Sequence, residues 1–341
     1  MAVVKPFRAL RYDEAAAGPL ESLVAPPYDV IAPEQRTELL ARSPHNVVRL
    51  TLPDSEEQAA RDLEDWRAGG VLVEEPPAVW ALRQDYVGPD GVARSRFGIA
   101  ASLKVEPYDT GTVLPHERTH AGPKEGRLRL LRATRVQLEP IFLLYDGPAP
   151  LAQPDRAPDL EVEGARLWRI DDLAVVRAFD DKQLLIADGH HRYETAVAFA
   201  EEEGTPASAQ MLVVLVSTSD PGLEIFPTHR LFAEPRRLEG SPDGGRTVTE
   251  ITREGARAVH VPEGMLDVQL VDTLGHEGIS YTADAGEAER RVRDGEAAVA
   301  YVLQPTRIED VFAYARRGEV LPQKTTYFFP KLISGLLLHP L

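Results

Sequence analysis

One segment of this chain, Ile186 to Thr195, restricts the possible folds more than any other. A short apolar run from Leu184 to Ala187 ends at the pair Asp188-Gly189, and a helix-forming sequence follows from Tyr193 to Glu203. Such a run is typical of a buried strand, and the Asp-Gly pair is typical of a tight turn. The segment therefore predicts a strand, a turn and a helix in immediate succession.

The start of the predicted helix is rich in groups that bind anions. Peptide N–H groups at a helix N-terminus have no partner within the helix, and they favour a negatively charged ligand. Arg192 adds a permanent planar positive charge, and His190 and His191 add two imidazoles. A phosphate-sized ligand suits this combination. The alternative is that Asp188 only caps the helix and that both histidines are ordinary surface residues.

The composition excludes several classes of protein. The chain has 341 residues, a formal net charge of −16 and no cysteine. The acidic balance argues against nucleic-acid binding, which depends on basic surface. The absence of cysteine excludes thiol catalysis, disulfides and cysteine-ligated metals. The N-terminus lacks the apolar core of a signal peptide, and no run is long enough to span a membrane. We therefore expect a cytoplasmic protein with no membrane partner; the sequence indicates no oligomeric state.

Strand and helix signals alternate along the chain and indicate an α/β or α+β fold with mixed sheets and helices. The predicted helices are Pro33–Arg42, Ser55–Ala68, Arg127–Val136 and Asp171–Phe179. The predicted strands are Asn46–Leu52, Val79–Tyr86, Arg94–Val105, Glu139–Tyr145, Ala165–Ile170, Gln210–Ser217 and Ala297–Leu303. Stretches rich in turn-forming residues predict an N-terminal α/β region 1–146, a region 161–238 with the strand-turn-helix segment, and a C-terminal α/β region 247–341.

A glycine- and proline-rich loop contains a second group of chemically active residues. Its segment from His116 to His120 matches H-E-x-x-H, in which a zinc protease needs both histidines on one helical face. Pro115 before the segment and Gly122-Pro123 after it leave no helix of useful length. Loops of this composition are common in binding sites, although a solvated loop is the alternative. The candidate site residues of this loop are His116, Glu117, Lys124 and Arg127.

Three further segments contain candidate binding residues. His229 and Arg230 follow an apolar stretch and form either a ligand site or an ordinary surface pair. The segment 322–331 is aromatic, whereas chain termini are usually polar and frayed. We expect it to pack on the body of the protein and to bring Lys324 to a site; the alternative is that its aromatic residues only fill the core. Tyr28 and Asp29, flanked by prolines, can present a phenol and a carboxylate at a pocket rim.

With these segments in view, the chain resembles a large prokaryotic family of proteins of unknown function, the one numbered one thousand and fifteen. Several separate matches in one order support membership of this family. The matching segments are Ala25–Ile31, His116–Thr119, Ala187–Ala196, Thr228–Leu231 and Pro322–Leu332.

A local resemblance concerns the strand-turn-helix segment. It is similar to the phosphate-binding box of the ParB and sulfiredoxin superfamily, which includes a free-serine kinase. The resemblance implies that Gly189 to Arg192 hold a phosphate at the helix start, as the residues themselves suggest. His190 stands where sulfiredoxin has its cysteine, and His191-Arg192 replaces an arginine pair of ParB. The resemblance therefore implies phosphate recognition. It implies neither the sulfur chemistry of sulfiredoxin nor the DNA binding of ParB.

The leading hypothesis is an enzyme of phosphoryl chemistry, a small-molecule kinase or phosphatase that binds a nucleotide (ATP or ADP) or a phosphorylated metabolite. The resemblance makes serine or phosphoserine a candidate substrate. Positioning and charge stabilisation are the main tasks in such reactions. Gly189, Arg192, Tyr193 and Lys324 would then surround the phosphate. Asp188 or Glu117 would serve as general base or Mg²⁺ ligand, and His190 or His191 as proton carrier or phosphoryl acceptor.

Two other classes of function remain as alternatives. The first is a non-catalytic nucleotide-binding module, which would recognise phosphate without turnover. The second is a divalent-metal-dependent hydrolase, with His116, His120 and the pair His190-His191 as metal ligands.

Overall fold

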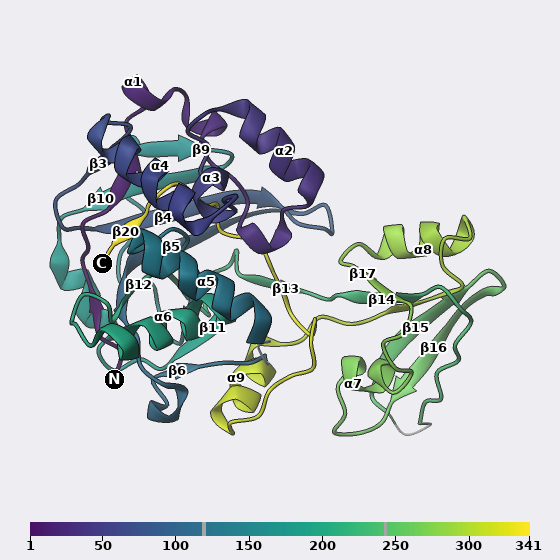
Figure 1. Ribbon diagram of the computed structural model, residues 1–341. Coiled ribbons are helices and arrows are strands. Elements are labelled where there is room, and N and C mark those ends of the chain that lie inside the picture. The colour runs from purple at the N-terminus through teal and green to yellow at the C-terminus, as the bar shows by residue number, and fades with distance from the viewer. Residues whose placement is uncertain (118–120, 242–243) are drawn as a thin grey trace. The chain divides into compact units, whose positions relative to one another are not determined.

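The computed structural model describes residues 1–117, 121–241 and 244–341 and divides into two compact units (Figure 1). The first unit consists of Met1–Tyr86, Arg94–Leu223 and Pro330–Leu341, and the second of Val87–Ala93 and Glu224–Phe329. Each unit is therefore assembled from segments that are distant in the sequence. The predicted regions 1–146, 161–238 and 247–341 are a different subdivision and stay a prediction. In the described residues, no helix is long and apolar enough to cross a membrane.

A mixed sheet forms the centre of the first unit. Its strand order is β6-β11-β8-β12-β5-β4-β10-β9, with β1 beside β5. β11 runs parallel to β6, and β12 runs parallel to β8, whereas β8–β11, β5–β12 and β4–β10 are antiparallel. The strands are β1 Val4–Lys5, β4 Val79–Val87, β5 Ala93–Lys104, β6 Val113–Leu114, β8 Ile141–Tyr145, β9 Leu160–Val162, β10 Ala165–Ile170, β11 Leu184–Asp188 and β12 Gln210–Ser217.

The main core lies on one face of this sheet, because successive side chains of a strand point to opposite faces. Met211, Val213 and Leu215 of β12 share this face, at every second position. Tyr193 and Ala196 of helix α6 (His190–Glu203) pack against the same core, as do residues of the 3₁₀ helix η4 (Leu173–Phe179). The packing of α6 on the sheet determines where its N-terminus, the candidate site, is held.

Further helices and two small strand pairs complete the first unit. α5 packs against α6, with Leu131 and Phe199 in a shared apolar cluster. The helices are α1 Glu14–Ala17, α2 Pro33–Arg42, α3 Val48–Thr51, α4 Glu56–Ala68 and α5 Ala121–Thr134, and the short 3₁₀ helices are η1 Leu20–Ser22, η2 Tyr28–Val30 and η3 Tyr108–Thr110. The strand pairs are β2 Leu10–Tyr12 with β3 Leu72–Glu74, and β7 Val136–Gln137 with β20 His339–Pro340.

The segment Asn46–Leu52 contains the short helix α3 and no strand, so its prediction as a strand is wrong. The side chain of Asn46 accepts a hydrogen bond from the backbone N–H of Val48 at 3.0 Å and opens the turn that becomes α3. Val47, Val48, Leu50 and Thr51 are all fully buried. A short apolar run that is buried on every side has no periodicity that separates a strand from a helix.

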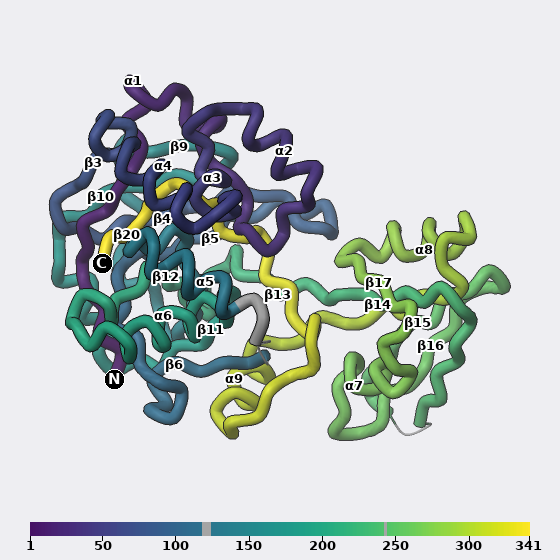
Figure 2. The backbone as a smooth tube through the Cα atoms, in the orientation of Figure 1, coloured from purple at the N-terminus to yellow at the C-terminus, as the bar shows by residue number. Residues whose placement is uncertain are grey.

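The C-terminal segment Pro330–Leu341 is part of the first unit (Figure 2). Ser334 pairs with Ala25 through two backbone hydrogen bonds, and Leu338 pairs with Leu10 in the same way. β20 then adds to β7. The segment therefore joins parts of the chain that lie more than 200 positions before it, and it carries Lys331 and Ser334 into the first unit.

The second unit contains an antiparallel sheet of strand order β16-β15-β18-β14-β17. Ala288 and Val292 of α8 pack on this sheet against Leu231 and Ala300. Its strands are β14 His229–Phe232, β15 Arg246–Thr252, β16 Gly255–Val261, β17 Ile279–Thr282 and β18 Val299–Val302, with the separate pair β13 Glu224–Phe226 and β19 Tyr327–Phe329. Its helices are α7 Asp267–Asp272, α8 Ala285–Arg293 and α9 Ile308–Arg316. Mixed sheets with helices confirm the predicted α/β fold class.

Candidate functional site

The predicted strand-turn-helix segment is present as β11, Gly189 and α6. Gly189 has a φ of +98°, in the left-handed region that favours glycine. A Cβ atom at this position would also lie 2.5 Å from Cγ2 of Ile141. Glycine tolerates the left-handed backbone and has no Cβ atom to collide with Ile141, so the chain can turn directly from β11 into α6. Asp188 is thereby placed next to the helix N-terminus.

The carboxylate of Asp188 binds two cations. Its Oδ2 accepts a hydrogen bond from Nη2 of Arg192 at 2.7 Å, and its Oδ1 accepts one from Nζ of Lys331. The side chains of Asp188 and Arg192 are 14% and 8% exposed. Burial alone would raise the pKa of Asp188, but Lys331 and Arg192 outweigh burial and hold that pKa below its ordinary value. The three side chains therefore carry one net positive charge at neutral pH.

Lys331 is a site residue that was not among the candidates predicted from the sequence. Arg96, which is 1% exposed, donates a hydrogen bond of 2.7 Å to the carbonyl of Pro330, and Gln84 donates one of 3.3 Å to the carbonyl of Lys331. These two bonds hold the backbone from which Lys331 reaches Asp188. Lys324, expected at a site, is exposed and belongs to the second unit, so its role stays a prediction.

His116 and His190 are buried next to each other, with ring centroids 4.7 Å apart. Nδ1 of His116 donates a hydrogen bond of 2.6 Å to the carbonyl of Ile186, so its Nε2 has the lone pair. The backbone N–H of His116 donates to Nε2 of His190 at 3.3 Å. Burial lowers the pKa of His116 to about 4 and lowers the pKa of His190 well below its ordinary value. Both imidazoles are therefore neutral at pH 7.

We expect acid to destabilise the protein through these buried histidines. Burial lowers the pKa values of His116, His229 and His339 to about 4 in the folded state, from 6.5 in the unfolded state. Between these values the unfolded chain binds more protons, so the free energy of unfolding falls as the pH falls. Each such histidine contributes a slope of about 1.4 kcal/mol per pH unit. Urea unfolding at pH 7, 6 and 5 measures how the free energy of unfolding depends on pH. A free energy of unfolding that is constant or rises toward pH 5 would contradict the prediction. The variant His116→Gln should show a smaller slope.

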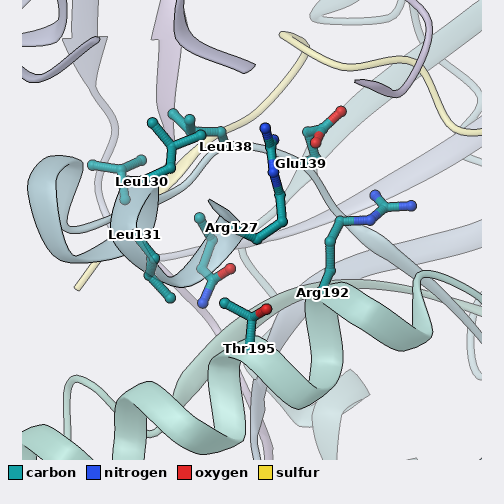
Figure 3. A pocket seen from close by; sticks show the side chains of 9 residues that line it. Arg127, Leu130, Leu131, Leu138, Glu139, Arg192 and Thr195 are labelled. Carbon is teal, nitrogen blue, oxygen red and sulfur yellow. The ribbon is translucent and has the colours of Figure 1, made fainter. Parts of the chain in front are cut away.

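A cavity of about 40 Å³ lies beside Arg192, within the first unit (Figure 3). Arg127 comes from α5, Arg192 from α6 and Glu139 from the segment that precedes β8. Among the lining residues in Figure 3, Glu139 and Arg192 lie on the right, and the apolar side chains Leu130, Leu131 and Leu138 lie on the left. Charged groups and an apolar wall thus meet in one small space.

Tyr28 joins Arg127 to Glu139. The guanidinium carbon of Arg127 lies 4.0 Å from the ring centroid of Tyr28, in a cation–π contact. Nη1 of Arg127 donates to the carbonyl of Thr51 at 2.7 Å, and the backbone N–H of Tyr28 donates to Oε1 of Glu139 at 3.0 Å. Burial raises the pKa of Tyr28, so its phenol is neutral at pH 7. Asp29, next to it, is exposed.

Other predicted residues of the first unit have contacts of their own. Nζ of Lys124 pairs with Glu194 at 2.6 Å and links α5 to α6. The hydroxyl of Tyr193 donates to the carbonyl of Glu106 at 2.8 Å in the core. Oε1 of Glu117 lies 3.9 Å from Nε2 of His116. His191 is half-buried in the first turn of α6. The structure thus brings Glu117 close to the histidine pair and uses Tyr193 in packing.

His229 and Arg230 lie in β14 of the second unit. Nδ1 of His229 accepts a hydrogen bond from the backbone N–H of Leu303 at 3.2 Å. Arg230 is 1% exposed and donates to the carbonyl of Gln323 at 3.1 Å. Both side chains therefore stabilise the second unit from within, and a role in ligand binding stays a prediction.

The described residues offer no ready metal centre. In the parts 1–117, 121–241 and 244–341, no group of three or more His, Asp or Glu side chains could hold a metal ion. His120, one ligand of the metal-hydrolase alternative, lies outside the described residues. Both carboxylate oxygens of Asp188 bind cations, so a Mg²⁺ ion there would have to displace Lys331 or Arg192.

The fold and the site define an α/β protein with a cationic strand-turn-helix site. The chain belongs to the family described as "Protein of unknown function (DUF1015)", whose model matches residues 4–243. No curated protein matches the sequence.

Several solved structures are similar at low identity. A free serine kinase in complex with AMP is 16% identical, with a TM-score of 0.40, and the match covers 66% of this chain and 89% of that chain. A C-terminally truncated SbnI from Staphylococcus aureus is 14% identical, with a TM-score of 0.42 and coverage of 68% and 85%. A conserved hypothetical protein from Pyrococcus furiosus is 16% identical, with a TM-score of 0.37 and coverage of 66% and 92%.

Proposed function

We propose that this protein binds a phosphate-bearing small molecule at the start of α6 and acts on it as a small-molecule kinase or phosphatase. The observation that carries the proposal is the cluster of Asp188, Arg192 and Lys331, whose net positive charge lies at a helix N-terminus. The helix N-terminus and the two cations both favour a negatively charged ligand. The proposed ligand is a nucleotide, ATP or ADP, or a phosphorylated metabolite, with serine or phosphoserine as the candidate substrate.

In this proposal Lys331 and Arg192 neutralise the phosphate oxygens, and Asp188 orients both cations. In a kinase, the acceptor hydroxyl oxygen bonds to phosphorus while the bond to the leaving nucleoside diphosphate breaks. The hydroxyl proton passes to a carboxylate, with Glu117 and Asp188 as candidate bases. In a phosphatase, water takes the place of the acceptor hydroxyl. His190 is less suited as a phosphoryl acceptor, because its Nε2 already accepts a hydrogen bond from the backbone N–H of His116; His191 is the other candidate.

A thermal-shift screen tests the phosphate proposal. ATP, ADP, AMP, phosphoserine and inorganic phosphate are added separately, with and without Mg²⁺. A ligand at one hundred times its Kd stabilises the folded state by about 2.7 kcal/mol, because it binds only the folded protein. We expect at least one phosphate compound to raise the melting temperature. No shift with any of them at millimolar concentration would overturn the proposal.

The histidine geometry favours the non-catalytic binding module as the second candidate. Both buried imidazoles are neutral and bonded to the backbone, which leaves neither as a proton donor at pH 7. Assays of product formation distinguish the four classes of function. Triphosphate consumption that depends on an acceptor indicates a kinase, and phosphate release without nucleotide indicates a phosphatase. Stabilisation without product indicates a binding module, and activity lost to a chelator indicates the metal-dependent hydrolase.

Lys331→Met is expected to weaken binding of the stabilising phosphate compound by about 1.5–3 kcal/mol, the range for hydrogen bonds to charged groups. Methionine keeps much of the side-chain length and removes the charge. Calorimetric titration measures the change, and Lys5→Met is the matched control, because Lys5 is an exposed lysine of β1 in the first unit and is not a candidate site residue. Equal affinity for Lys331→Met and the unmodified protein would remove Lys331 from the site.

A further inference from the structure

Glu139 is a buried carboxylate that has no direct ion pair among the described residues, although the charge of Arg192 attracts it at longer range. Glu139 as a whole residue is 4% exposed. Oε1 accepts hydrogen bonds from the backbone N–H of Tyr28 at 3.0 Å and from the hydroxyl of Ser334 at 2.7 Å. Within the described part of the chain, the ion pairs of Arg192 and Lys124 are with Asp188 and Glu194, and not with Glu139. A buried carboxylate is costly unless hydrogen bonds and cations compensate its charge, so a ligand cation in direct contact with Glu139 would be favourable.

Two positively charged side chains line the same cavity as Glu139. Arg127 and Arg192 line the same space, and each has guanidinium N–H groups beyond those used for the carbonyl of Thr51 and for Asp188 and Pro140. Figure 3 shows the side chains of Arg127, Glu139 and Arg192 around one side of the cavity. A guanidinium beside the cavity disfavours a metal ion at Glu139. A ligand cation at Glu139 is therefore best tolerated when the ligand also carries an anionic group for the two guanidinium groups.

The size of the cavity limits the part of a ligand that it can enclose. A volume of about 40 Å³ holds roughly three water molecules, at about 10–15 Å³ each. This space accepts a head group of a few atoms, and the rest of a ligand would extend through the open side of the cavity. The apolar wall of Leu130, Leu131 and Leu138 suits the carbon atoms that join two charged groups.

We propose that this cavity binds the head group of a small zwitterion, an amine-bearing acid, with its ammonium group on Glu139 and its anionic group on Arg127 and Arg192. The proposal rests on the proposed function, because Arg192 lines the cavity and also binds Asp188 in the phosphate site. The zwitterion is then the small substrate that gives or receives the phosphoryl group. Glu139 recognises its amine, and Arg192 links the two subsites.

Four probes that differ by one group each test the proposal on the unmodified protein. L-serine carries both charges, N-acetyl-L-serine and 3-hydroxypropionate lack the ammonium group, and ethanolamine lacks the carboxylate. Thermal shift and calorimetric titration are run with and without ADP. We expect L-serine to bind at least tenfold more tightly than each of the other three. Equal binding of L-serine and 3-hydroxypropionate, or no binding of L-serine at 20 mM or so, would overturn the proposal.

Glu139→Gln tests the carboxylate itself. The amide oxygen can still accept from Tyr28 and Ser334, while the negative charge is lost. We expect L-serine to bind about tenfold to a hundredfold more weakly, with phosphate or ADP binding retained. Glu201→Gln, at an exposed position of α6, is the control and should leave both unchanged. Undiminished L-serine binding by Glu139→Gln would refute the role of Glu139. Failure of every phosphate compound on the unmodified protein would instead refute the proposed function.

Discussion

Arg192→Ala is expected to lower the free energy of unfolding of the first unit by about 3 kcal/mol, the lower end of the range for breaking a buried ion pair. The side chain is 8% exposed, and it donates both to Asp188 and to the carbonyl of Pro140. Removing it leaves that carbonyl without this donor and Asp188 with Lys331 alone. Because Lys331 remains, the cost stays below that of a carboxylate with no cation. Binding of a phosphate compound is expected to weaken as well.

Tryptophan fluorescence during urea unfolding measures this effect selectively. The three tryptophans of the chain, Trp66, Trp80 and Trp168, all belong to the first unit. Arg132→Ala is the matched control: Arg132 pairs with Glu202 at 2.7 Å, but both side chains are 42% exposed, and exposed pairs contribute little. Equal unfolding midpoints for the two variants would show that Arg192 contributes no more than a surface pair.

Arg192→Lys separates charge from geometry. Lysine keeps the positive charge but lacks the planar fork that donates in two directions. We expect a stability between those of Arg192→Ala and the unmodified protein, because a lysine can reach one of the two acceptors at a time. A stability equal to that of the unmodified protein would mean that charge alone holds Asp188.

Local signals in the sequence were sufficient for much of the fold. Pro33 suits the first turn of a helix, and α2 begins at that residue and ends at Arg42 as predicted. The strands at Ala165–Ile170 and Gln210–Ser217 are also confirmed, because their apolar runs are bounded by turn-forming residues. The prediction of a strand at Asn46–Leu52 failed because Val47, Val48, Leu50 and Thr51 are all buried, which removes the periodicity on which the prediction depends.

The candidate site could be predicted only where its residues are neighbours in the chain. Asp188, Gly189 and Arg192 lie within five residues, and their spacing already places them at a helix start. Lys331 is 143 positions from Asp188, and Ser334 is 195 positions from Glu139. No local pattern encodes a pairing at that distance.

The choice between Lys324 and Lys331 illustrates the same limit. Both lie in one aromatic segment, seven positions apart. The hydrogen bonds from Arg96 and Gln84 to the backbone at Pro330 and Lys331 decide which lysine reaches Asp188, and both donors are on distant strands. Glu139 escaped notice for a related reason. Its position before an apolar strand is typical of a surface residue, and one of its hydrogen bonds comes from Ser334 of the C-terminal segment.

Gly189→Ala is expected to destabilise the first unit by about 2–5 kcal/mol, the largest effect of a one-carbon change in this site. Left-handed backbone costs a residue with a Cβ atom about 1–2 kcal/mol, and overpacking a core costs about 1–3 kcal/mol more. Both apply at Gly189, which has a φ of +98° and whose new Cβ would lie 2.5 Å from Cγ2 of Ile141 and 3.0 Å from its Cβ. Ile141 is fully buried in β8, so it has no open space into which to move.

Gly204→Ala isolates the contribution of the contact with Ile141. Gly204 ends α6 with a φ of +63°, and a Cβ there would meet nothing within 4 Å. The same helix thus offers backbone strain alone at one end and strain with a steric clash at the other. We expect Gly204→Ala to cost about 1 kcal/mol, so the difference between the two variants measures the clash. If both variants unfold at the same urea concentration, the turn at Gly189 can shift away from Ile141, and the position of Asp188 is not fixed by packing.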